Sequence, residues 1–447
     1  MSKITLETFT NRFREVLEFL LGESIKNASI LLAVSGGVDS IVMLELFDTF
    51  QSEFGYQIAV ATFNHKLRKE ADEEVRFVES LCKEKNIPFF TSQADVLHYS
   101  KEHKLSIEEG ARILRYKFLT YVADNYNYKY IATAHNTNDL LETMILRLTK
   151  GTGPYGLVGM SPINGRFIKP LLFFTREEIE NYAQARKLRF VTDTSNFDVK
   201  YNRNFIRHRI IPLLKEINPS VELASLRLAQ SIWELDEYVG SIVDEFNNKY
   251  STKIGEYFVF KLHENSYIQT EQVRRNALLV FGKPIDNEKL ERFKNVQKSG
   301  KTSYKVSFWK ELGIEVSRGW CIMGKIIGYP RFSETVLISK DKVQSELNVN
   351  GYFLKITNYG IMKGTSERKL IFEIRNWLEG DRLLSGKKVK ELFIEKKVPT
   401  FVKHLIPLVV SKQEEKVIYI PYLYEAKEYL REMEITIETK GGLHFES

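Results

Sequence analysis

The stretch Ser29-Ile-Leu-Leu-Ala-Val-Ser-Gly-Gly-Val-Asp-Ser40 decides the fold of this 447-residue chain. Its first half is almost wholly apolar, as in a strand that is buried on both faces of a parallel sheet. Its second half places two glycines between that strand and a helical pattern. Such a turn presents backbone N–H groups, and the following helix adds its N-terminal partial positive charge. The stretch therefore predicts an α/β fold with an anion site at the turn.

Short apolar runs alternate with helical patterns on both sides of this stretch. The pattern predicts further strands at 58–63, 89–91 and 130–134, and helices over 40–50, 70–85 and 107–125. Alternation of this kind is typical of a parallel sheet covered by helices. We therefore expect an N-terminal, Rossmann-like parallel sheet with helices on both faces.

The pattern changes beyond Pro212. A long helical stretch over 221–248 is followed by mixed segments, and extended runs punctuated by glycine begin near residue 325. We expect three domains: an α/β domain at 1–216, a mainly helical domain at 217–325, and a basic α+β domain at 326–447.

Charge and cysteine content exclude several classes of protein. The chain has 65 Lys and Arg against 58 Asp and Glu, a net charge of +7 that permits a polyanionic partner without requiring one. Its two cysteines, Cys82 and Cys321, lie far apart, which disfavours a disulfide scaffold, a C-x-x-C pair and a cysteine zinc site. No apolar run approaches the roughly 18 residues of a membrane span. We expect a cytoplasmic protein.

The glycine-rich turn supplies the first candidate site. Its residues are Ser35, Gly36, Gly37, Val38, Asp39 and Ser40. Backbone N–H groups and the serine hydroxyls can bind phosphate, and Asp39 can hold Mg²⁺ on the phosphates. The alternative is a structural turn in which a serine caps the helix.

A second candidate follows the strand at 130–134. Asp139 and Glu142 are three residues apart, so they share a face of a helix and suit a cationic substrate or a metal. The alternative is a charged first helical turn that is stabilised by the helix dipole. His135, directly after the strand, is either a site residue or a structural one.

Arginines form two further clusters. Arg112 and Arg115 are neighbours on one predicted helix face and can each bind a carboxylate or phosphate. Arg203, Arg207 and Arg209 are interleaved with an amide and aromatic residues after the segment Asp193-Thr-Ser-Asn196. Such mixtures bind phosphates and stack on exposed bases.

These segments, in this order, resemble the PP-loop ATP pyrophosphatase superfamily and, within it, the bacterial tRNA(Ile)-lysidine synthetases. The matching pieces are SGGVDS at 35–40, FNHKLR at 63–68, EEGARILRY at 108–116, AHNTNDLLET at 134–143, RLTKGTGPYGLVGM at 147–160 and DTSNFDVKYNRNFIRHRIIPLL at 193–214. The match is close over 29–214 and weaker in GDRLLSGKKVKELFIEKKVP at 380–399.

The resemblance implies a reaction and its partners. Lysine is joined to C2 of the wobble cytidine in the CAU anticodon of tRNA(Ile), with ATP and Mg²⁺, through an adenylated cytidine. The partners would be L-lysine and tRNA(Ile), and the family precedent suggests a homodimer as one assembly.

The resemblance also implies roles for individual residues. The 35–40 turn would bind the pyrophosphate end of ATP, with Asp39 on the metal. Arg203, Arg207 and His135 would face the developing charge at the α-phosphate. Asp139 and Glu142 would receive the ammonium groups of lysine, and Arg112 its carboxylate or a neighbouring phosphate. The basic segment would hold the tRNA backbone through Lys387, Lys388, Lys390, Lys396 and Lys397.

The chain departs from the family at one motif. The usual AHHxDDQ reads AHNTNDLL, so Asn136, Asn138 and Leu140 have no assigned catalytic role. Three alternatives stay open. A PP-loop RNA thiolase would need cysteines, an ammonia-using PP-loop synthetase would not need the arginine-rich 200–209 segment, and a non-catalytic RNA-binding protein would keep only a relic nucleotide site.

Overall fold

The computed structural model describes residues 5–66, 71–191, 202–339, 342–362 and 369–441. The chain forms two compact units, residues 1–236 and 237–447. The boundaries expected near residues 216 and 325 stay predictions. Residues 67–68 of the FNHKLR motif and residues 193–201, including Asp193 and Asn196, lie outside the described residues.

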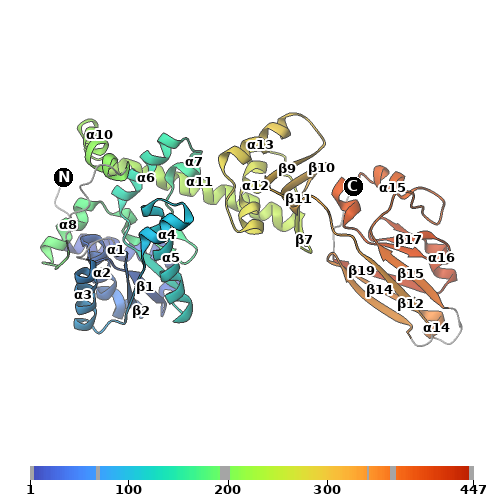
Figure 1. Ribbon diagram of the computed structural model, residues 1–447, viewed down its shortest axis with the longest axis horizontal. Coiled ribbons are helices and arrows are strands. Elements are labelled where there is room, and N and C mark those ends of the chain that lie inside the picture. The colour runs from blue at the N-terminus through green and yellow to red at the C-terminus, as the bar shows by residue number, and fades with distance from the viewer. Residues whose placement is uncertain (1–4, 67–70, 192–201, 340–341, 363–368, 442–447) are drawn as a thin grey trace. The chain divides into compact units, whose positions relative to one another are not determined.

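The first unit is an α/β unit (Figure 1). Its strands are β1 (Ser29–Ala33), β2 (Gln57–Asn64), β3 (Phe89–Gln93), β4 (Tyr130–Thr133), β5 (Ile163–Asn164) and β6 (Phe167–Ile168). Its α-helices are α1 (Leu6–Leu21), α2 (Val38–Phe54), α3 (Ala71–Glu84), α4 (Val96–His103), α5 (Ile107–Asn125), α6 (Thr137–Lys150), α7 (Pro154–Val158), α8 (Arg176–Ala185), α9 (Asn202–Phe205) and α10 (Ile211–Ile217). Short 3₁₀ turns occupy Gly22–Ile25 and Pro170–Phe173, and a π-helical turn occupies Ile206–Ile210.

The strands of this unit form one sheet in the order β3-β2-β1-β4-β6-β5. All neighbouring pairs are parallel except β5 and β6, which are antiparallel. The strand order reverses at β1, because β2 and β3 lie on one side of it and β4 on the other. In open α/β sheets such a reversal opens a crevice at the carboxyl ends of the strands, where ligands bind.

Both faces of the sheet are covered, as the apolar β1 sequence predicts. Ile30 and Leu32 pack in the core that contains Val42 of α2. Leu31, which points the other way, packs with Leu119 of α5. Figure 1 shows α2 and α3 on one side of the sheet and α5 on the other. The predicted N-terminal parallel α/β fold is confirmed.

The second unit is built from antiparallel sheets and helices. Its strands are β7 (Ser251–Ile254), β8 (Tyr257–Lys261), β9 (Ser303–Trp309), β10 (Leu312–Ser317), β11 (Trp320–Lys325), β12 (Ser333–Ile338), β13 (Gln344–Val349), β14 (Tyr352–Asn358), β15 (Leu370–Arg375), β16 (Leu408–Ser411), β17 (Lys416–Ile420), β18 (Tyr424–Glu425) and β19 (Ile435–Gly441). The remaining helices are α11 (Val221–Tyr250), which begins in the first unit, α12 (Ser266–Phe281), α13 (Asn287–Lys298), α14 (Tyr359–Met362), α15 (Val389–Glu395), α16 (Lys427–Glu432) and the 3₁₀ helix Thr400–His404.

The middle of the chain is mainly helical, as predicted, and its helices pack on a five-stranded antiparallel sheet, β7-β8-β11-β10-β9. Phe293 of α13 and Val273 of α12 form a core with Phe260 of β8. Beyond it lie a five-stranded sheet, β12-β15-β16-β17-β18, and a three-stranded sheet, β13-β14-β19, which confirm the α+β C-terminal region. Among the described residues, no helix has both the length and the apolarity that crossing a membrane requires.

Candidate active site

The 35–40 loop leaves β1 and turns sharply into α2. Gly36 has a φ of 91°, a left-handed conformation that favours glycine, and its carbonyl accepts from the Val191 N–H at 2.9 Å. The Ser40 hydroxyl accepts from the Ser35 N–H at 3.2 Å and donates to the Gly37 carbonyl at 2.9 Å. These bonds hold the backbone of the loop in place. Ser40 therefore has a structural role in the turn, and this role does not exclude phosphate binding by the same loop.

The N-terminus of α2 is left open, unlike those of two neighbouring helices. Asn136 at the start of α6 and Thr175 at the start of α8 each close a capping box. Gly37, at the start of α2, contributes no side-chain cap. The first N–H groups of α2 therefore keep their capacity to bind an anion, as the sequence predicts.

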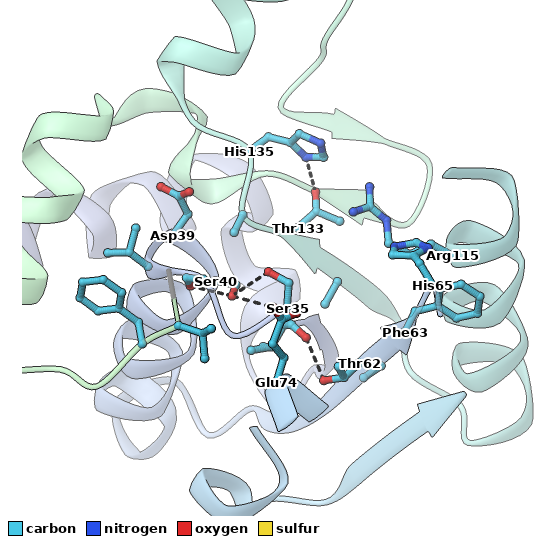
Figure 2. A pocket seen from close by; sticks show the side chains of 18 of the residues that line it. Ser35, Asp39, Ser40, Thr62, Phe63, His65, Glu74, Arg115, Thr133 and His135 are labelled. Carbon is cyan, nitrogen blue, oxygen red and sulfur yellow. Dashed lines mark hydrogen bonds between the residues drawn. The ribbon is translucent and has the colours of Figure 1, made fainter. Parts of the chain in front are cut away.

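A pocket of about 730 Å³ lies at this end of the sheet, within the range of small-molecule sites. It sits where the carboxyl ends of β1 and β4 diverge. Of the residues predicted for the site, it is lined by Ser35, Gly37, Val38, Asp39, Ser40, His135, Asp139 and Arg207. Figure 2 shows Ser35, Asp39 and His135 around the pocket, with Arg115 reaching toward it from α5.

Asp39 is the carboxylate of the loop. It accepts a hydrogen bond from Nδ2 of Asn136 at 3.1 Å and forms an ion pair with Arg176. Burial raises the pKa of Asp39 to about 6, although Arg176 lowers it. The described residues contain no cluster of three or more metal-ligating side chains. Mg²⁺ does not need such a cluster, because it is commonly held by one or two carboxylates together with substrate phosphates. Asp39 fits that role.

His135 follows β4 and shares a 3.0 Å hydrogen bond with the Thr133 hydroxyl. Burial and the positive charges of Arg115 and Lys169 together lower the pKa of His135 to about 4, although the charge of Asp139 raises it. The ring is therefore neutral at neutral pH. In this state His135 can offer a neutral hydrogen bond, and its expected role at the α-phosphate stays a prediction.

Asp139 and Glu142 do share a face of α6, and they converge on Arg207. The guanidinium of Arg207 holds Glu142 through two bonds, from Nε at 2.6 Å and Nη2 at 3.1 Å, and its Nη2 lies 3.6 Å from Asp139. The Glu142 side chain is only 1% exposed. Burial raises the pKa of Glu142, which Arg207 opposes. Asp139 also completes the capping box by accepting from the Asn136 N–H at 3.0 Å. A cationic ligand would have to take the place of Arg207.

The arginines of α5 divide between the pocket and the surface. Arg115 lines the pocket, its Nε has no hydrogen-bond partner, and burial lowers its pKa. Arg112 is exposed, does not line the pocket, and lies 5.5 Å from the centre of the Tyr116 ring. Arg203, also outside the pocket lining, donates to the Thr143 hydroxyl at 3.1 Å. Arg115 is therefore better placed than Arg112 to meet an anion in the pocket.

The basic C-terminal segment lies in the second unit. Lys387, Lys388, Lys390, Lys396 and Lys397 are all exposed. They flank and begin the short helix α15. Lys387 forms an ion pair with Glu395, which reduces the positive charge available there.

Reasoning from the sequence missed two cations, Arg176 in the pocket lining and Lys169 near His135. Arg176 pairs with Asp39, 137 positions away in the chain. The Thr175-x-x-Glu178 pattern could have marked the start of α8, but not the direction of the Arg176 side chain. Lys169 is buried near this cluster, donates to the Ser161 carbonyl at 2.8 Å, and has its pKa lowered to about 8 by burial.

The three departures from the family motif have structural explanations. Asn136 caps α6 and contacts Asp39, whereas Leu140 is fully buried in the core. Asn138 accepts from the Arg176 N–H at 2.9 Å and donates to Glu222 at 3.1 Å. Each is a positioning or packing residue in this structure.

Comparison with known proteins agrees with this geometry. A family model described as a PP-loop domain matches residues 6–214. The tRNA(Ile)-lysidine synthase of Thermosipho africanus is 45% identical over 424 residues, which are 94% of this chain and 96% of that protein. The protein of the same name from Thermotoga sp. strain RQ2 is 36% identical over 93% of this chain and 98% of its own length. A solved U34-tRNA thiolase, NcsA from Methanococcus maripaludis, has a TM-score of 0.45 at 18% identity over 51% of this chain and 80% of that chain, too low to bear on function.

The open helix N-terminus, the glycine loop and the sheet reversal define a PP-loop ATP-binding domain, and the family match covers that region. The similarity to the relatives extends well beyond it, over nearly the whole length of both chains. The chain belongs to the tRNA(Ile)-lysidine synthase family.

Proposed function

We propose that this protein ligates lysine to C2 of the wobble cytidine in the CAU anticodon of tRNA(Ile), consuming ATP and releasing AMP and pyrophosphate. The observation that carries the proposal is the 45% identity to a tRNA(Ile)-lysidine synthase over 94% of the chain, together with an open phosphate loop. The reaction has two steps, activation of the base and attack by the amine.

ATP binds with its pyrophosphate end on the 35–40 loop. The N–H groups at the start of α2, with the Ser35 and Ser40 hydroxyls, hold the phosphate oxygens. Asp39, together with the phosphates, would hold Mg²⁺, which would supply positive charge to offset that of the phosphates. Glycine is needed at position 36 because any side chain would strain the backbone conformation of this sharp turn.

In the first step, O2 of the cytosine attacks the α-phosphorus and pyrophosphate leaves. Negative charge develops on the α-phosphate, and fixed donors stabilise it most when they do not have to reorganise. Arg115 and Arg207 line the pocket, with Arg203 close behind, and the neutral His135 adds a hydrogen bond. The esterified oxygen is then a good leaving group.

In the second step, the ε-amine of lysine attacks C2 and AMP leaves. We place the ammonium group of lysine against Asp139 and Glu142, where it takes the place of the Arg207 guanidinium. The displaced Arg207 then faces phosphate. The lysine carboxylate is assigned to Arg112 or to Arg115, of which Arg115 lines the pocket.

The tRNA backbone is held by the exposed lysines of the second unit, Lys387, Lys388 and Lys390, with Lys396 and Lys397 beside them. Contacts of this kind position the nucleic acid without reading its sequence. The expectations of a cytoplasmic location and a homodimer stay predictions.

The alternative of a thiolase is disfavoured by the state of the two cysteines. Cys82 and Cys321 are fully buried and lie in different units. Burial raises the pKa of Cys82 to about 12 and also raises that of Cys321. Because the thiolate is the reactive form, neither cysteine is a suitable sulfur carrier.

The test uses the full chain with ATP, Mg²⁺, lysine and a tRNA(Ile) transcript, and it follows pyrophosphate and lysine separately. Asp139→Asn and Glu142→Gln keep the size of the side chains and remove their charge. Each variant should lose roughly ten- to hundredfold in lysine use, the value of one charged hydrogen bond, while pyrophosphate release changes much less. Equal loss of both steps would contradict the assignment to lysine.

A further inference from the structure

Arg176, the first residue of α8, lines the same pocket as the 35–40 loop. Its Nη1 donates to the carboxylate of Asp39, and its Nε donates to Glu180 at 2.6 Å. The side chain is 43% exposed, so the ion pair with Asp39 lies at the pocket surface and is open to exchange. No motif assigns this residue a role.

The charges around Asp39 must change when nucleotide binds. The Arg176 guanidinium forms an ion pair with the Asp39 carboxylate. A triphosphate on the 35–40 loop would add negative charge beside that carboxylate, because both line one pocket, and Mg²⁺ bound with it would become the partner of Asp39. The Arg176 guanidinium, which lines the same pocket, would then lie beside phosphate oxygens. Its planar set of N–H donors suits hydrogen bonds to such oxygens.

We propose that Arg176 is an ATP-binding residue that transfers from Asp39 to the triphosphate when ATP and Mg²⁺ bind. This inference rests on the proposed function, because it requires ATP in the pocket. It gives Arg176 two successive partners of the same charge. Arg176 thereby holds the Asp39 carboxylate in place until ATP and Mg²⁺ bind.

The start of α8 is held in place for this exchange by an amide bridge. The Arg176 N–H donates to Oδ1 of Asn138 at 2.9 Å, and Nδ2 of Asn138 donates to Glu222 of α11 at 3.1 Å. Glu222 is 4% exposed, and Nζ of Lys215 lies 2.5 Å from the same carboxylate oxygen. An amide at position 138 both accepts and donates, whereas an ionised aspartate could only accept. Asn138 and Glu222 are therefore positioning residues for Arg176.

The test is the affinity for ATP with Mg²⁺, measured by titration calorimetry on the full chain. Arg176→Ala should weaken binding by about tenfold or more, the value of one charge-assisted hydrogen bond. Arg186→Ala is the matched control. Arg186 lies at the end of the same helix, is 44% exposed and pairs with Glu45 at 2.8 Å, but it does not line the pocket. It should leave the affinity unchanged.

Unchanged or tighter binding by Arg176→Ala would overturn the inference, because a residue that only competes with the cation for Asp39 binds no phosphate. If the unmodified chain binds no ATP, the proposed function fails, and this inference fails with it. If the unmodified chain binds ATP and Arg176→Ala binds it with the same affinity, the inference is overturned while the proposed function stands.

A second pair of variants tests the bridge. Asn138→Asp places a carboxylate against that of Glu222 and removes the N–H donor between them. This change should displace the start of α8, which carries Arg176, and weaken ATP binding several-fold. Adding Glu222→Gln returns a donor across the same gap and should restore the affinity. A melting temperature measured alongside separates local repositioning from unfolding. Equal affinities in the unmodified chain, the single variant and the double variant would overturn the positioning role.

Discussion

Replacing Arg207 with alanine removes the counter-charge from a carboxylate that has almost no contact with water. Glu142 is 1% exposed and receives two hydrogen bonds from the Arg207 guanidinium, at 2.6 and 3.1 Å. Without Arg207, Glu142 must either stay charged while shielded from water or take up a proton. Breaking a buried pair in this way is costly because it leaves one charge uncompensated.

The free energy of protonating Glu142 sets an upper limit to the stability that Arg207→Ala loses. From an ordinary pKa of 4.5, neutralising a glutamate costs about 3.4 kcal/mol at about pH 7 and about 0.7 kcal/mol at about pH 5. Because Arg207 is itself 38% exposed, its removal admits some water. We therefore expect a loss of about 2 kcal/mol at neutral pH. In the variant, the folded-state pKa of Glu142 lies above the unfolded value, so the penalty is absent at low pH and grows as pH rises.

The measurement is a urea titration of the full chain read by chemical labelling of Cys82, a thiol fully buried in the first unit. It is repeated at about pH 5 and about pH 8. Arg209→Ala, an exposed arginine in the same π-helical turn, is the control and should change stability by less than about 0.5 kcal/mol. Adding Glu142→Gln to Arg207→Ala should remove the dependence on pH.

A loss of stability that is the same at both pH values would refute this reasoning. It would mean that Arg207 contributes through packing of its aliphatic stem and not through the charge of Glu142. A loss that becomes larger at low pH would also refute it, because the sign would be reversed.

Three further outcomes are expected. Gly36→Ala should weaken ATP binding by roughly tenfold, because an alanine at a φ of 91° carries a backbone strain of about 1–2 kcal/mol. A clash would not contribute, because a Cβ there would meet no atom closer than 3.5 Å. Calorimetry measures the affinity, and an unchanged value would count against the strained turn. The apparent affinity for ATP with Mg²⁺ should fall as pH drops through about 6, where Asp39 takes up a proton, and a flat profile from pH 5 to 8 would argue against Asp39 as the metal ligand. Changing Lys387, Lys388 and Lys390 together to alanine should weaken tRNA binding and reduce the slope of log K against log salt by up to about 3, and an unchanged slope would place the phosphate contacts elsewhere.

The sheet and the phosphate loop could be predicted because their signals are local. The apolar run of β1, the two glycines and the helical pattern after them are contiguous, and the helix that the pattern predicts over 107–125 agrees with α5. Asp39 and Asp139 line one pocket, and their proximity could be predicted because the carboxyl ends of parallel strands meet at one edge of a sheet.

The partners of those side chains could not be predicted, because they come from distant parts of the chain. Nothing in a D-x-x-E spacing indicates that Glu142 is already held by Arg207, 65 positions away. The charge state of His135 depends on burial and on the charges of Asp139, Arg115 and Lys169, and Lys169 lies in none of the motifs that the sequence shows. Arg176 gave no signal at all, since an arginine at the start of a helix is unremarkable until the fold brings Asp39 to it.

The most direct measurement of the central claim is incorporation of labelled lysine into a tRNA(Ile) transcript with a CAU anticodon, in the presence of ATP and Mg²⁺. A second transcript carries uridine in place of the wobble cytidine. The account predicts labelling of the cytidine transcript alone, with one AMP formed for each lysine. Cleavage of ATP to AMP and pyrophosphate with no lysine on either transcript would contradict it, and the amine would have to be a different one.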